Sequence, residues 1–87
     1  MEEIRSKKEI TMKILELEKE LMCTHIDSTK KLIRTKINTL KLVLRIRSKQ
    51  EVAMKIAELG KELEYRYTDD AKELIRAKIE TFKWAIC

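Results

Sequence analysis

The sequence predicts an all-α protein, an antiparallel up-down-up-down four-helix bundle built from two tandem helical hairpins. The composition points to long amphipathic helices, because 40% of the residues are charged, 44% are hydrophobic, one is glycine and none is proline. Apolar residues recur three and four positions apart, and no sustained alternation typical of strands is found. The chain also repeats itself. At 87 residues it is expected to form a single domain.

The internal repeat has a length of 42 residues and needs no gap. When residues 5–45 are aligned with residues 47–87, 21 of 41 pairs are identical. One hairpin of this length buries too little apolar surface to be stable alone, whereas two of them make a bundle. We therefore expect one domain over 1–87, with repeat 1 at 5–45 and repeat 2 at 47–87, arranged like a fused homodimer of hairpins.

Each copy reads as a helix, a turn and a second helix. Ser6 followed by Glu9, and Ser48 followed by Glu51, predict a capping box at the start of the first helix of each copy. The helices are expected to span 6–22, 28–46, 48–65 and 70–86. Buried residues are expected to include Leu17, Leu21, Ile37, Leu40, Leu59, Leu63, Ile79 and Phe82.

The junction between the copies allows two arrangements, because it contains neither glycine nor proline. In one continuous helix, the apolar seam after Ser48 would point about 130° away from the apolar face before it. A break at Arg47–Ser48 lets both faces share one core, and we favour this arrangement. The alternative, an unbroken rod, would produce a domain-swapped dimer.

The sequence lacks the residue patterns that most enzymes need. Nucleophilic catalysis needs a base beside the nucleophile. His25 is the only histidine, and it lies in the first predicted turn with no nucleophile indicated beside it. Cys23 and His25 supply two metal ligands, but no second pair completes a tetrahedral site. Gly60, expected to mark close packing inside a helix, cannot form a phosphate-binding loop alone. We therefore expect no enzyme, no catalytic residue, no cofactor, no metal and no small-molecule substrate.

The sequence also favours a cytoplasmic protein with no membrane partner. No stretch is apolar enough to cross a bilayer, and the acidic start Met1-Glu2-Glu3 is unlike a signal peptide. Two cysteines, Cys23 and Cys87, are too few for a disulfide framework, and the bundle topology is expected to hold them more than about 20 Å apart. The abundance of Lys, Glu and Ile is typical of thermophiles and of AT-rich genomes.

One predicted helix carries an unusual basic surface. The segment from Ser28 to Gln50 has eight basic residues and no acidic one, whereas the second copy has Asp70, Glu73 and Glu80 in the matching segment. On a helical wheel, several of the basic residues of the Ser28–Gln50 segment form a ridge about 22 Å long, away from the apolar face. Such a ridge suits a phosphate backbone, and the alternative is a merely solvated face. The basic ridge consists of Lys30, Lys31, Arg34, Asn38, Lys41 and Arg45.

A second candidate surface is apolar. Four residues matched by the repeat lie opposite the seams of their own helices on a wheel, and a set that contains a tryptophan is better explained by an interface than by chance exposure. Leu15 and Met22 widen the apolar arc of the first helix, where the second copy has Ala57 and Glu64. The candidate oligomer interface consists of Met12, Leu42, Met54 and Trp84.

These observations lead to two functional hypotheses. The first is a non-enzymatic helical-bundle module that acts by self-association, as a homo-oligomer or with a helical protein partner. The alternative is nucleic-acid binding through the basic ridge. Salt distinguishes the two, because phosphate binding weakens steeply at high salt whereas apolar association persists.

Overall fold

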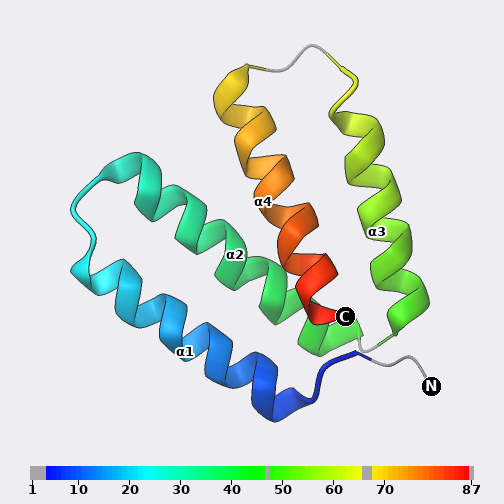
Figure 1. Cartoon of the computed structure of the whole chain (residues 1–87), viewed down its shortest axis with the longest axis horizontal. Coiled ribbons are helices and arrows are strands. Elements are labelled where there is room, and N and C mark those ends of the chain that lie inside the picture. Colours follow the sequence, from blue (N-terminus) through cyan, green and yellow to red (C-terminus); the bar gives the residue numbers. More distant parts are fainter. Residues whose placement is uncertain (1–3, 47, 66–67, 87) are drawn as a thin grey trace.

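The computed structural model describes residues 4–46, 48–65 and 68–86, which form four packed α-helices (Figure 1). This confirms the all-α class. The predicted helix boundaries lie within one residue of the observed ones, except at the C-terminal end of the third helix. There, residues 63–65 form a turn in which the N–H groups of Glu64 and Tyr65 donate to carbonyls three residues earlier. The helices are α1 (Lys7–Cys23), α2 (Asp27–Ile46), α3 (Lys49–Glu62) and α4 (Asp69–Ala85).

The start of α3 shows that the chain breaks between the copies. Ser48 has an extended backbone, with φ −125° and ψ 121°, and its hydroxyl accepts a hydrogen bond from the N–H of Glu51. The predicted break is therefore confirmed at Ser48, and the unbroken rod is wrong; Arg47 lies outside the described residues. Ser6 caps α1 in the same way and completes the predicted capping box with Glu9.

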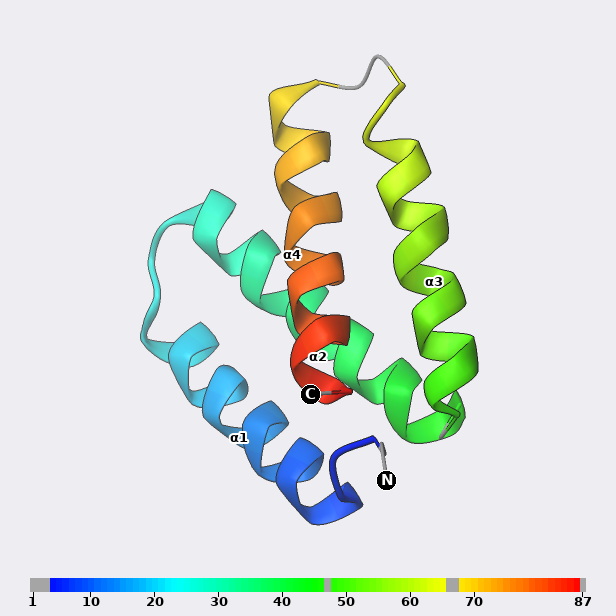
Figure 2. The ribbon, with the colours of Figure 1, turned by 45° about the vertical axis from the view of Figure 1, so that its right-hand side comes forward.

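The helices form two antiparallel hairpins, α1–α2 and α3–α4, which meet through α2 and α4 (Figures 1 and 2). α1 packs on α2 and α3 packs on α4, whereas the contact between α2 and α3 is slight. The turns of the two hairpins lie far apart, and the open ends of the hairpins converge (Figure 1). The result is a slab of 38 × 33 × 17 Å in which α2 and α4 are the central pair.

At the converging end, the segment before α1 is hydrogen-bonded to the last turn of α4. The Arg5 N–H donates to the carbonyl oxygen of Ala85 at 2.7 Å, and Arg5 Nε donates to the carbonyl oxygen of Trp84 at 2.6 Å. A shift of 42 residues places Arg5 on Arg47 and Ala85 on Val43. The contact between α4 and the segment before α1 is therefore equivalent, through the repeat, to the covalent connection from α2 to α3.

The hydrophobic core lies along the α1–α2–α4 side of the molecule. α1 and α2 contribute seven of its buried members, whereas Val52 is the only buried residue of α3. Among the residues expected to be buried, Leu17, Ile37, Leu40 and Phe82 are buried. The others are half-buried; they are Leu21, Leu59, Leu63 and Ile79. For Leu59 and Leu63 the reason is that α3 lies at the edge and packs mainly on α4.

Two further expectations have different outcomes. A Cβ atom added at Gly60 would meet no atom within 4 Å, so the expectation that this glycine marks close packing is wrong. The expected separation of Cys23 from Cys87 cannot be compared with the structure, because Cys87 lies outside the described residues. Cys23 itself is exposed and carries a free thiol.

Candidate functional site

The basic ridge lies on the solvent side of α2. Its residues are exposed, apart from Lys30, which is half-buried. Within the described part of the chain, the ion pairs join Arg5 to Glu9 and Lys13 to Glu16, and none involves the ridge. The cationic side chains of the ridge are therefore open to an anionic partner.

The two ends of the ridge have different surroundings. Lys31 and Arg34 line an open groove of about 380 Å³ between the N-terminal parts of α2 and α4, together with Asp70 and Glu73. These carboxylates reduce the positive potential at that end, although they belong to the other copy. The C-terminal end, which carries Lys41 and Arg45, does not line that groove.

The four residues of the candidate oligomer interface differ in their exposure to solvent. Met12 and Met54 are exposed, as expected from the wheel. Leu42 and Trp84 are half-buried and pack against the core. The structure thus leaves the two methionines on the outside and draws Leu42 and Trp84 into grooves between helices.

An apolar stripe runs along the outer face of α1. Met12, Leu15 and Met22 are 55%, 52% and 84% exposed, and their spacing places them within about 80° on the helix. They lie opposite the buried face of α1, which contains Ile10, Ile14 and Leu17. We call these three exposed residues the outer α1 face.

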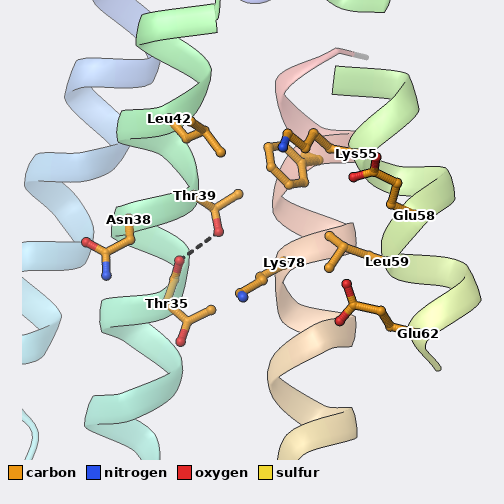
Figure 3. Close-up of a pocket in the computed structure, with 10 residues that line it drawn as sticks. Thr35, Asn38, Thr39, Leu42, Lys55, Glu58, Leu59, Glu62 and Lys78 are labelled. Atoms are coloured by element: carbon orange, nitrogen blue, oxygen red, sulfur yellow. Dashed lines mark hydrogen bonds between the residues drawn. The ribbon is translucent and has the colours of Figure 1, made fainter. Parts of the chain in front are cut away.

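A groove separates α2 from α3, with α4 contributing Lys78 and Phe82 (Figure 3). It has a volume of about 450 Å³. In Figure 3, α2 presents Asn38 and Leu42 on one side, and Glu58 and Leu59 of α3 lie on the other. We call it the α2/α3 groove; its lining is completed by Thr35, Thr39, Lys55 and Glu62.

A smaller groove of about 160 Å³ lies between α1 and α4, with α2 contributing Lys36 and Leu40. We call it the α1/α4 groove. Each of its seven lining residues corresponds, through the 42-residue repeat, to a residue that lines the α2/α3 groove. The two grooves are therefore equivalent, and the sequence repeat corresponds to a repeat of the structure. The remaining lining residues are Lys13, Leu17, Glu80, Thr81 and Trp84.

The grooves differ at two aromatic positions, one of which is Phe82 in the α2/α3 groove, where the α1/α4 groove has Leu40. Trp84 in the α1/α4 groove corresponds to Leu42 in the α2/α3 groove. The Trp84 ring contacts two cations: Arg5 Cζ lies 4.4 Å and Lys13 Nζ lies 5.9 Å from its centroid. Both distances are within the range of cation–π attraction. Sequence reasoning missed the grooves, although the replacement of leucine by tryptophan between the copies was a signal for them.

The structure of the described residues also bears on metal binding and on membrane insertion. No group of three or more His, Cys, Asp or Glu side chains in the described ranges is arranged to hold a metal ion. His25 is exposed in the turn between α1 and α2. Among the helices described, none is long and apolar enough to cross a membrane.

Comparisons with protein-family models, with curated proteins and with solved structures give no match to this chain.

Proposed function

We propose that this protein is a non-enzymatic interaction module that self-associates through the outer α1 face. The observation that carries the proposal is the exposure of Met12, Leu15 and Met22 in one stripe. The fold does not need apolar residues there, because the second copy has Ala57 and Glu64 in place of Leu15 and Met22. Exposed apolar side chains that gather on one helix face and that the fold does not require are typical of a contact surface.

The expected strength of self-association follows from the area available. Complete burial of one such side chain contributes about 1.5–3 kcal/mol, so a symmetric pair of faces offers about 9–18 kcal/mol at most. Association costs about 4–15 kcal/mol in lost freedom. We therefore expect a weak, concentration-dependent dimer in the micromolar range rather than a permanent one.

The proposed architecture is an up-down-up-down bundle that is open between α2 and α3. Support comes from the antiparallel course of each hairpin and from the direct contact of α2 with α4. A second copy docked on α1 leaves this opening untouched, because the outer α1 face points away from the core.

Sedimentation equilibrium at increasing protein concentration tests self-association. The wild type should dimerise at both low and high salt, and the double variant Leu15→Glu, Met22→Glu should remain monomeric. The matched control is Ala57→Glu, which places a charge at the position equivalent to Leu15 and should dimerise normally. A wild type that is monomeric at every concentration contradicts the proposal, and so does a double variant that dimerises like the wild type.

A second candidate function, nucleic-acid binding, is favoured by the exposure of the basic ridge and by the lack of ion pairs to it within the described residues. Because acidic residues lie near its N-terminal end, the C-terminal end should dominate. The variant Lys41→Glu, Arg45→Glu should abolish binding to duplex DNA or structured RNA. Lys83→Glu, which changes the residue equivalent to Lys41, is the matched control and should bind as the wild type does.

Salt titration completes this second test. The logarithm of the affinity should fall by about 0.7–0.9 for each phosphate contact as the logarithm of the salt concentration rises. No binding by the wild type at low salt would remove the nucleic-acid hypothesis.

A further inference from the structure

The two equivalent grooves differ most at the position of Trp84 and Leu42, and this difference indicates what the larger groove can hold. In the α1/α4 groove the protein supplies its own indole ring, which packs against the core and leaves about 160 Å³. In the α2/α3 groove the equivalent residue is the smaller Leu42, and about 450 Å³ stays open. In the α1/α4 groove, the indole of Trp84 thus occupies space that stays open in the α2/α3 groove.

The chemistry around Trp84 shows what stabilises a ring there. Lys13 places its ammonium 5.9 Å from the centroid of the indole, and Leu17 and Leu40 also line that groove. Cations are attracted to the electron-rich face of an aromatic ring, and an indole is the best of the natural rings for this contact. Apolar side chains, the ammonium of Lys13 and the guanidinium of Arg5 together surround the indole in this fold.

The α2/α3 groove has a similar lining, with Phe82 in place of Leu40 and no counterpart of the Trp84 indole. Lys55 corresponds to Lys13, Leu59 to Leu17 and Phe82 to Leu40. The charges of the lining balance, because the groove is lined by two lysines, Lys55 and Lys78, and by two glutamates, Glu58 and Glu62. Such a lining favours a neutral guest. The volume lies within the range of small-molecule sites, which extends from about 300 to 1,000 Å³.

We propose that the α2/α3 groove is a binding site for a neutral aromatic molecule of the size of indole. The ring lies against Leu42, Leu59 and Phe82, and the ammonium of Lys55 lies over its face, as that of Lys13 does over Trp84. The proposal is independent of self-association, because the groove residues are separate from the outer α1 face.

Titration with indole, followed by the methyl NMR signals of Leu42 and Leu59, tests this site. The signals should shift and saturate with one indole per chain, in the millimolar range expected for a small open site. Lys55→Met should weaken binding about two- to fivefold, which corresponds to the loss of one exposed cation–π contact.

Two tryptophan variants provide the matched comparison. Leu42→Trp gives the groove its own indole and should abolish binding, whereas Met54→Trp adds an indole to an exposed position of α3 and should leave binding unchanged. The reciprocal variant Trp84→Leu should open the second groove and raise the stoichiometry to two. Circular dichroism verifies that each variant is folded.

The opposite results are equally clear. Absence of saturable shifts in the wild type overturns the proposal. Equal binding by Leu42→Trp and Met54→Trp shows non-specific apolar contact and overturns it as well.

Discussion

The guanidinium of Arg5 stacks on the indole of Trp84, with Cζ 4.4 Å from the ring centroid, while Nε of the same side chain donates to the Trp84 carbonyl oxygen. The two residues are 79 positions apart in the sequence. Their contact joins the segment before α1 to the last turn of α4, and the backbone bond from Arg5 to Ala85 supports it. The first and last parts of the described chain are thereby held together.

Replacing Arg5 with alanine should measure the strength of this contact. Loss of a cation–π contact and of a hydrogen bond should lower the free energy of unfolding by about 1–2 kcal/mol. Trp84 is the only tryptophan, so its fluorescence reports both urea unfolding and the local environment. Its emission should shift to the red. Lys7→Ala, which changes an exposed residue nearby, should cost less than about 0.5 kcal/mol; equal effects of the two variants would contradict this prediction.

The two capping serines allow a matched measurement of the capping box. At Ser6, the hydroxyl accepts from the Glu9 N–H at 3.2 Å and the Glu9 carboxylate accepts from the Ser6 N–H at 3.3 Å. At Ser48, the described contacts include the first of these bonds but not the second. Both glutamates lie in the first turn of a helix, so their favourable interaction with the helix dipole cancels in a comparison.

Glu9→Ala should therefore destabilise the protein by about 0.5–1 kcal/mol more than Glu51→Ala, because Glu9 contributes both the reciprocal hydrogen bond and the ion pair with Arg5. Thermal unfolding of the two variants, followed by circular dichroism, provides the measurement. Equal destabilisation would mean that neither the second bond of the capping box nor the ion pair with Arg5 adds to stability.

Gly60→Ala should stabilise the protein. A methyl group at this position meets no atom within 4 Å, and alanine is favoured over glycine in a helix interior by about 0.5–1 kcal/mol. Urea unfolding should show a higher midpoint with an unchanged slope. Ala57→Gly, at an exposed position of the same helix, should have the opposite effect. A destabilised Gly60→Ala would show that the site is more crowded than in the structure.

A circular permutant tests the equivalence of the two connections between the copies. A chain that starts at Ser48, ends at Ile46 and joins Cys87 to Ile4 through a short Gly-Ser linker should fold, because Arg5 and Ala85 are already in contact. Its helix content and cooperative unfolding should match those of the wild type. An unfolded permutant would show that the segment around Ser48 does more than connect the hairpins.

Local features were the most predictable from the sequence. The capping serines and the break at Ser48 depend on residues within one helical turn, so the sequence pattern contains them. The helix boundaries followed for the same reason, apart from the last turn of α3, where residues 63–65 leave the helix although no glycine or proline marks the place.

Relations between helices were less predictable. A helical wheel assigns one buried face, but α2 contacts α1, α4 and, slightly, α3. Leu42 is therefore half-buried although it lies opposite the seam of its own helix. Leu59 is only half-buried because α3 is at the edge of the molecule. The acidic surroundings of Arg34 were also not predictable from its own helix, because Asp70 and Glu73 belong to the other copy.

The paired grooves have a consequence for how such a protein can change. In a homodimer of a single hairpin, both grooves are encoded by the same residues, so a substitution that closes one closes the other. Fusion of two copies in one chain removes that constraint. Trp84 can then fill one groove and secure the fold through Arg5, while Leu42 leaves its counterpart free to acquire a ligand. The duplication thus allows the two equivalent grooves to differ within a chain of 87 residues.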